Sequence, residues 1–168
     1  MSLALLCLPA LVGASDDQVS EALRDELQHL TGGAFRIHLS GETTVVTDAP
    51  DAPAAACALH LHKVIPKMWK LASLPKDAPV PDAFVIALFA QRADCDRFVK
   101  ARKGNPHGAY TYLHDERPAR RVIAAFVLDT RPMLARLRHT AFEALLCAWV
   151  SAPPLWLREG LGECMEDA

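Results

Sequence analysis

The chain has 168 residues, of which 51% are hydrophobic and 23% are charged. These values are typical of a single globular domain and exclude the disordered class of protein. The formal net charge of −2 excludes recognition of nucleic acid through a strongly basic surface field, so we expect no nucleic-acid partner.

The first fourteen residues form an apolar run that ends in Val-Gly-Ala at 12–14 and is followed by Ser-Asp-Asp at 15–17. This pattern is similar to an export signal with a small-residue cleavage site, although no Lys or Arg precedes the run. Residues 1–14 are therefore either a leader of a periplasmic or secreted protein, or a first strand or helix of a cytoplasmic one. The run is too short to span a bilayer and no other segment is apolar enough, so we expect no stable membrane insertion.

The remaining residues, 15–168, are expected to form one domain whose elements follow from hydrophobic periodicity and turn signals. In chain order we expect a helix over 17–30, strands over 35–39 and 43–47, a helix over 54–74, a strand over 83–89, a helix over 93–103, strands over 109–114 and 122–129, a helix over 130–150, and a final helix after the Pro-Pro pair at 153–154. This order predicts an α+β fold.

Three local signals refine these elements. Pro66 predicts a kink or an end within the helix over 54–74. Thr130 can cap the helix that follows it, with Pro132 in the first turn. The uninterrupted apolar run up to Phe89 is typical of a central strand.

The five cysteines have no C-x-x-C spacing, and the four beyond the leader can form up to two disulfides or remain as buried free thiols.

The last two helices carry the charged residues that most need an explanation. His139 and Glu143 lie four residues apart on one face of a helix that is apolar nearly all the way round. A carboxylate in such surroundings must be paired, hydrogen-bonded or bound to a metal ion. In the final helix Glu159 and Glu163 are also four apart, and the glycines between them allow another backbone to approach closely.

Two sequence frames identify a family that the chain resembles. They are R-H-x-x-x-x-A-L-L at 138–146 and W-L-x-E-G-L-x-E at 156–163. From about residue 43 to residue 163 the chain resembles the peptidase-MA-like domains of the gluzincin metallopeptidases, which occur in many bacterial proteins. The resemblance implies a zincin-like mixed sheet with an active-site-type helix pair at the C-terminus. Active members of the clan continue beyond these helices, so the resemblance implies either the N-terminal part of a longer peptidase-like protein or a domain that lacks half of the cleft.

The resemblance also implies a role for each motif position. His139, Glu143 and Glu159 correspond to the first, second and third zinc ligands, and Glu163 to the carboxylate that orients a ligand. Thr140 occupies the position of the general base. The strand from Val122 to Leu128 (122–128) corresponds to the edge along which such peptidases bind a protein or peptide by β-augmentation.

Two of these positions depart from the family's H-E-x-x-H motif. The hydroxyl of Thr140 has far too high a pKa to take a proton from metal-bound water, and the loss of a general base costs about 10²–10⁴-fold in rate. Glu143 replaces an imidazole by a carboxylate, which changes the preference from zinc toward Mg, Ca or Mn. The set of His139, Glu143 and Glu159 can still hold a divalent ion.

These departures favour a catalytically degenerate, non-hydrolytic domain (a pseudoenzyme) that is exported and binds a protein or peptide, or serves as a scaffold, with no cofactor or with a divalent metal alone. The alternative is a metal-dependent peptidase in which Glu143 or Glu163 acts as the base. A third interpretation is a structural domain within a larger exported protein.

A metal site and a metal-free polar cluster share most of their expected geometry and differ in which groups pair. In both cases we expect the side chains of His139, Glu143 and Glu159 to converge, with their nearest polar atoms within about 4–6 Å. In the metal-free cluster His139 bonds one of the two carboxylates, and Arg138 or Arg158 neutralises the other.

Overall fold

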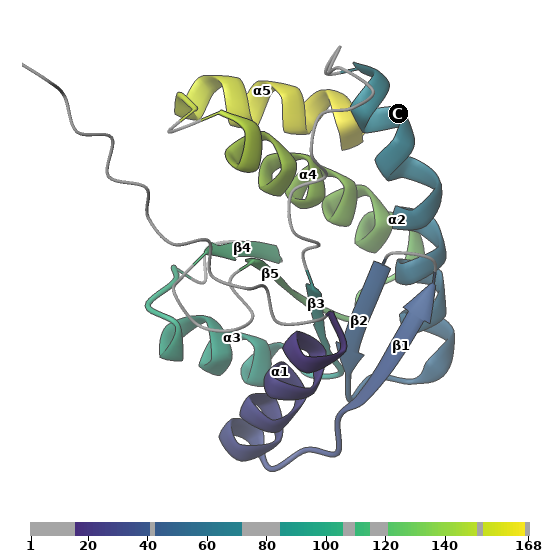
Figure 1. Cartoon of the computed structure of the whole chain (residues 1–168), viewed down its shortest axis with the longest axis vertical. Helices are drawn as coiled ribbons and strands as arrows, with labels where there is room; N and C mark the ends of the chain where they lie inside the picture. Colours follow the sequence, from purple (N-terminus) through teal and green to yellow (C-terminus); the bar gives the residue numbers. More distant parts are fainter. Residues whose placement is uncertain are drawn as a thin grey trace, which may run out of the picture.

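The computed structural model describes residues 16–40, 43–71, 85–105, 110–114, 121–150 and 153–166. Figure 1 shows these residues as one α+β unit, in which helices cover both faces of a mixed sheet. In chain order the elements are α1 (Asp16–Thr31), β1 (Arg36–Ser40), β2 (Thr43–Thr47), α2 (Asp51–Leu71), β3 (Val85–Phe89), α3 (Arg92–Ala101), β4 (Tyr110–His114), β5 (Arg121–Phe126), α4 (Thr130–Trp149) and α5 (Leu155–Glu166). The predicted α+β class is confirmed.

The sheet has the strand order β1-β2-β3-β5-β4 within the described residues. Its three inner strands are parallel, and each outer strand runs antiparallel to its neighbour. The inner strands are buried on both faces, which explains the nearly continuous apolar sequences of β3 and β5 and the β-branched residues throughout β2.

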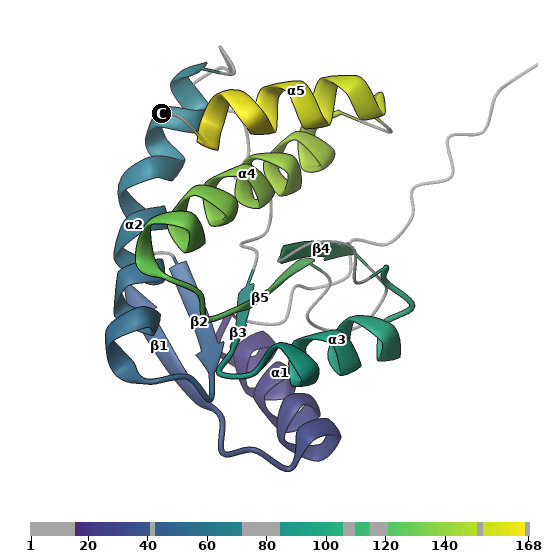
Figure 2. The ribbon, with the colours of Figure 1, turned by 180° about the vertical axis from the view of Figure 1, so that it is seen from behind.

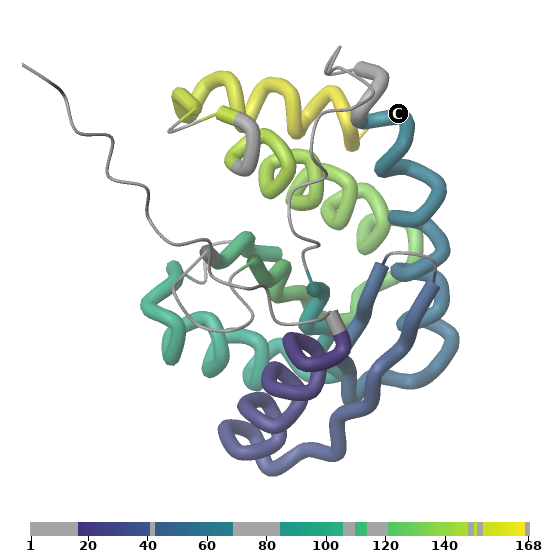
Figure 3. The backbone as a smooth tube through the Cα atoms, in the orientation of Figure 1, coloured from purple at the N-terminus to yellow at the C-terminus, as the bar shows by residue number. Residues whose placement is uncertain are grey.

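Two apolar cores lie on opposite faces of this sheet (Figures 1 and 2). Alternate residues of β5 divide between them: Ile123 and Ala125 pack with α2 and α4, whereas Val122 and Ala124 pack with α1 and α3. Helix α5 packs against α4 on the side away from the sheet, as the tube in Figure 3 also shows, and Met165 carries it into the α2–α4 core.

Most of the predicted elements agree with the structure to within a few residues, with two local corrections. The long helix α2 does not end at Pro66 but continues through it to Leu71. The N-cap residue of α4 is Asp129 and not Thr130, and no side-chain hydrogen bond caps this helix. The predicted strand residues 83 and 84 lie outside the described part of the chain.

The four described cysteines are free thiols, so none of them forms the disulfides left open by the sequence.

The predicted edge strand is wrong. The strand from Val122 to Leu128 corresponds to β5, which bonds to β3 on one side and to β4 on the other. Among the described strands the edge on this side is β4. The sequences agree with this order, because β5 is apolar at five successive positions from Val122 to Phe126, whereas Tyr110, Thr111 and Tyr112 of β4 carry hydroxyl groups and are partly exposed. Over the same described residues, no helix is both long and apolar enough to cross a membrane.

Candidate functional site

A cleft of about 470 Å³ lies between the edge strand β4 and the helix pair α4–α5. Tyr110 to Leu113 of β4 form one wall. The opposite wall carries the motif residues His139, Thr140 and Glu143 of α4, and Glu159 of α5. The fold therefore brings four of the five predicted site residues to one cleft, beside the strand that ends the sheet.

The His139 imidazole lies against α5, and two glutamates of that helix face its two nitrogens. Nε2 is 3.7 Å from Oε2 of Glu159, and Nδ1 is 3.1 Å from Oε1 of Glu166. The second contact is close enough for an ion pair, but its alignment does not make a hydrogen bond, so Nδ1 is buried without a hydrogen-bond partner. The expected approach of His139 to Glu159 is present in the structure.

Glu143 makes a different contact. Its Oε1 lies 3.2 Å from Nη2 of Arg158, with 19% of the Glu143 side chain and 31% of the Arg158 side chain exposed. The carboxylate of Glu143 thus faces a guanidinium group, which supplies the opposite charge. Arg158 faces Glu143 as one of the expected pairings, whereas the 3.7 Å between His139 and Glu159 is longer than a hydrogen bond.

Thr140, at the general-base position, is only 5% exposed. Its hydroxyl donates a hydrogen bond of 3.0 Å to the backbone carbonyl of Arg136, one turn earlier in the same helix. The hydroxyl is therefore engaged by its own helix, and its chemistry cannot replace a carboxylate base.

Glu163 does not hold the orienting position that the resemblance implies. It is exposed on α5, and among the described residues no hydrogen bond or ion pair joins it to His139 or Glu159. Glu166 contacts His139 instead, and the sequence analysis missed it. The spacing of Glu159, Gly162 and Glu166 could have identified it, because positions i, i+3 and i+7 share one helical face.

The two helices are held together at their other end by Arg138. Its Nε donates a 2.8 Å hydrogen bond to the carbonyl of Met165, and Nη2 donates to the carbonyl of Glu166. These carbonyls belong to the last turn of α5, where a carbonyl group has no N–H partner within the helix. Arg138 therefore caps α5 and fixes its position on α4, and it does not neutralise a carboxylate of the cleft.

The side chains, as placed, do not fit a zinc ion. Within the described residues no group of three His, Cys, Asp or Glu side chains is arranged to hold a metal ion. Structural and catalytic zinc sites need at least three protein ligands that converge at about 2.0–2.3 Å from the ion. Here one of the three expected ligands, Glu143, is paired with Arg158, so a metal would have to displace that guanidinium first.

Three titratable groups of the cleft region remain neutral at ordinary pH. Burial raises the pKa of Tyr112, and burial also raises the pKa of Tyr110, whose hydroxyl donates a 3.2 Å hydrogen bond to the carbonyl of Phe126. Burial raises the pKa of the Cys147 thiol as well, although the neighbouring Arg158 guanidinium acts in the opposite direction. A thiol with a raised pKa is a poor nucleophile, so we assign Cys147 no catalytic role.

Comparison of the chain with protein-family models and with curated protein sequences finds no match. The α+β fold and the cleft geometry are thus the observations on which a function can be argued.

The two glycines of α5 give a matched test of how His139 is held. A Cβ atom added at Gly162 would lie 2.6 Å from Nε2 of His139, whereas one added at Gly160 would meet nothing within 4 Å. We expect Gly160→Ala to raise the free energy of unfolding by about 0.5–1 kcal/mol, because alanine is the better helix former. We expect Gly162→Ala to lower it by about 1–3 kcal/mol through overpacking.

Urea denaturation measures both changes, and the NMR signals of the His139 ring should move in the Gly162→Ala variant alone. Equal stabilisation by the two substitutions would contradict the close packing of His139 on α5.

Proposed function

We propose that this chain is a catalytically degenerate metallopeptidase-like domain that binds a protein or peptide without hydrolysing it. The ion pair between Glu143 and Arg158 carries the proposal. In a zinc peptidase the second ligand must give its lone pair to the metal, and a neighbouring guanidinium would compete for the same atoms. The hydrogen bond from Thr140 to its own helix also supports a non-hydrolytic domain, because the residue at the expected general-base position is then engaged by the backbone.

The edge strand β4 supports the binding part of the proposal. An edge strand presents backbone N–H and C=O groups on its outer side, and a peptide in extended conformation can add to it as a further strand. Tyr110 and Tyr112 of β4 line the cleft below α4, so a peptide on this edge would also contact the cleft. The resemblance to gluzincins implies that the peptide binds at an edge strand. Because β5 is an inner strand and β4 is the edge, we assign the binding to β4.

Metal content and peptide cleavage test the degenerate assignment together. We expect the purified protein to contain less than one tenth of an equivalent of zinc by mass spectrometry, about the level of adventitious metal. We also expect no cleavage of a fluorogenic peptide pool above background, with or without added zinc. Stoichiometric zinc together with cleavage that a chelator abolishes would overturn the proposal and restore the alternative, a peptidase with altered ligands.

Hydrogen exchange tests the binding edge separately. With a saturating pool of extended peptides, the amides of β4 should exchange more slowly, whereas those of β1, at the opposite edge of the sheet, should not change. Protection at β1 and not at β4 would contradict the assignment of β4.

A further inference from the structure

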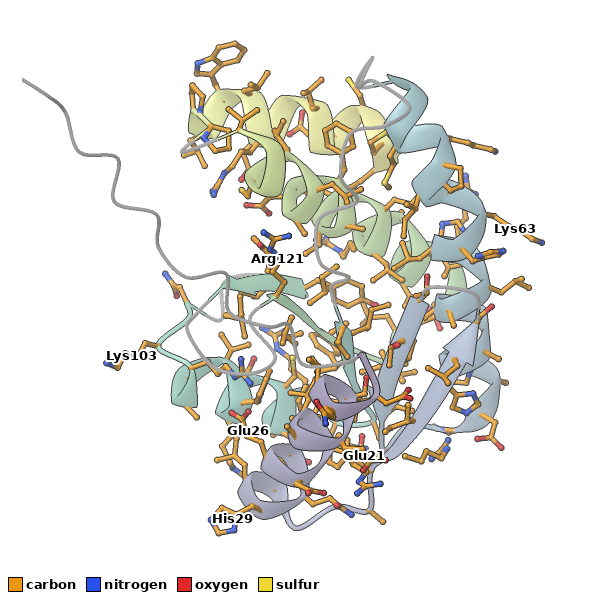
Figure 4. The ribbon with its side chains drawn as sticks, in the orientation of Figure 1. Glu21, Glu26, His29, Lys63, Lys103 and Arg121 are labelled. Atoms are coloured by element: carbon orange, nitrogen blue, oxygen red, sulfur yellow. The ribbon has the colours of Figure 1, made fainter. Side chains whose placement is uncertain are left out.

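Arg121 is the first residue of β5, and it lies on the face of the sheet that is covered by α4. Side chains alternate along a strand, and Ile123 and Ala125 of the same strand pack into the α2–α4 core. In Figure 4 the labelled Arg121 side chain points from the sheet toward the helix pair α4–α5, whereas the labelled Lys63 and Lys103 point outward from the molecule.

Arg121 differs from the buried and partly buried arginines described above, because one of its buried nitrogens has no acceptor. Arg102 and Arg158 each face a carboxylate, and Arg138 donates to two carbonyls. In contrast, Nη1 of Arg121 is buried without a hydrogen-bond partner, and no ion pair to Arg121 occurs in the part of the chain that the structure describes. An unpaired buried donor costs about 1–3 kcal/mol, and more when it is charged.

Arg121 is not one of the residues that line the cleft, but it lies diagonally across the β4–β5 pair from Tyr112, which lines it, on the same face of the sheet. Tyr112, a residue of the cleft wall, senses the charges of both Arg121 and Glu143: burial raises its pKa, Arg121 lowers it, and Glu143 raises it. Arg158, which also lines the cleft, has its own Nε buried without a hydrogen-bond partner. One guanidinium group with an unused donor, that of Arg158, therefore lines the cleft, and a second, that of Arg121, lies beside the cleft wall formed by Tyr112.

We propose that Arg121, assisted by Arg158, binds a carboxylate group of a peptide that lies along β4. A guanidinium matches a carboxylate in shape and can donate two parallel hydrogen bonds to it. The cleft also contains the carboxylates of Glu143, Glu159 and Glu166, which repel a doubly charged phosphate more strongly than a singly charged carboxylate. The carboxylate site rests on the two guanidinium groups and their unpartnered nitrogens, and its assignment to a peptide rests on the proposed function.

Acetate is the probe that tests the carboxylate site alone. We expect a titration with sodium acetate, at constant ionic strength against chloride, to shift the NMR signal of the Arg121 Nε–H group saturably, with a Kd on the order of 1 mM. Arg121→Gln should weaken acetate binding at least about tenfold, and Arg121→Lys, which keeps the charge but loses the fork of donors, should weaken it less. Arg131→Gln removes an exposed arginine at the start of α4, and this control should bind acetate as the unchanged protein does.

The absence of a saturable shift in the unchanged protein, or equal acetate affinity in Arg121→Gln and Arg131→Gln, would overturn the site. If Arg121→Gln does not fold, Arg121→Lys provides the same comparison, and an affinity equal to that of the unchanged protein again overturns the site.

Two pools of acetylated random hexapeptides, one with a free and one with an amidated C-terminus, identify the source of the carboxylate. Preferential retention of the free-acid pool on immobilised protein assigns Arg121 to a C-terminal carboxylate. Enrichment of Asp and Glu within the retained amidated pool assigns it to an acidic side chain. Retention of both pools alike, without such enrichment, overturns the inference but leaves peptide binding intact. Acetate binding at Arg121 with no retention of either pool overturns the proposed function and leaves the carboxylate site.

Discussion

The Glu26→Ala variant is expected to lose about 2–4 kcal/mol of unfolding free energy, although Glu26 is far from the cleft. Glu26 of α1 accepts a 3.1 Å hydrogen bond from Nε of Arg102, whose side chain is only 1% exposed, and a second bond from Nη2. The guanidinium also lies over the ring of Phe98, 5.2 Å from its centroid. Removal of the Glu26 carboxylate takes both of these hydrogen bonds, and the opposite charge, away from the buried Arg102 guanidinium. The cost is somewhat below that of a fully buried pair because 27% of the Glu26 side chain is exposed.

Glu21→Ala is the matched control on the same helix, labelled with Glu26 in Figure 4. Glu21 pairs with Arg24 at the surface, where half of its side chain is exposed, and its removal should change the free energy of unfolding by less than about 0.5 kcal/mol. Urea denaturation compares the two variants. The double change Glu26→Leu with Arg102→Leu should cost less than Glu26→Ala, because it removes both charges of the pair together. A cost for Glu26→Ala no larger than for Glu21→Ala would show that the α1–α3 ion pair does not stabilise the fold.

The parts of the fold that the sequence predicts well are those with local signals. The hairpin over 35–47 has two short strands joined by a Gly-containing turn, and α4 has a Pro in its first turn and Pro-Pro after its end. These patterns depend on neighbours in the sequence, which is why the bounds agree within a few residues. Pro66 is the exception, because packing of α2 on the sheet keeps the helix intact beyond it.

The strand order could not be predicted in this way. The strands β3, β4 and β5 follow one another in the chain, but β5 inserts between the other two. The position of β5 is decided by tertiary packing, since both of its faces must be covered by helices. The three successive hydroxyl-bearing residues Tyr110 to Tyr112, against the continuous apolar run of β5, are a usable signal for the edge.

In the site, the sequence identifies the cleft-lining positions but not their partners. His139, Glu143 and Glu159 lie where helical spacing and the motif frames place them. Which cation meets Glu143 depends on how α5 crosses α4, and this crossing is fixed by Arg138 at the C-terminal end of α5. Such long-range contacts have no counterpart in the spacing of one helix, so neither Arg158 at Glu143 nor Glu166 at His139 could be assigned before the structure.

The variant that combines Glu143→His with Arg158→Gln is expected to gain zinc affinity by about 10³-fold or more over the unchanged protein. The Glu143→His change supplies an imidazole one turn from His139, the geometry that two histidines on a helix use to bind zinc. Glu159, whose Oε2 is already 3.7 Å from Nε2 of His139, provides the third ligand. Arg158→Gln is needed because the guanidinium now lies 3.2 Å from the Glu143 carboxylate and would repel a divalent cation.

Competition titration with a chromogenic zinc chelator measures this gain, and Glu143→Gln with Arg158→Gln is its control, since it makes a similar change in charge without adding the imidazole. Affinity that rises equally in both variants would mean that the removal of Arg158, and not the completed ligand set, created the site. No gain in either variant would mean that α4 and α5 do not hold His139 and Glu159 in a zinc-binding geometry, and the gluzincin resemblance would then lack its structural basis.

Adding Thr140→Glu to the zinc-binding variant separates the loss of metal from the loss of the base. Position 140 lines the cleft, so the new carboxylate can reach metal-bound water if its side chain turns away from the packed interior. We expect a rise in chelator-sensitive cleavage of the fluorogenic peptide pool of about 10²-fold or more over the variant without this change, the contribution of a positioned general base. Zinc binding without any such rise would show that the two motif changes are not the whole defect, because a zinc ion and a base without a group to stabilise the developing oxyanion still lack a large part of the catalytic effect.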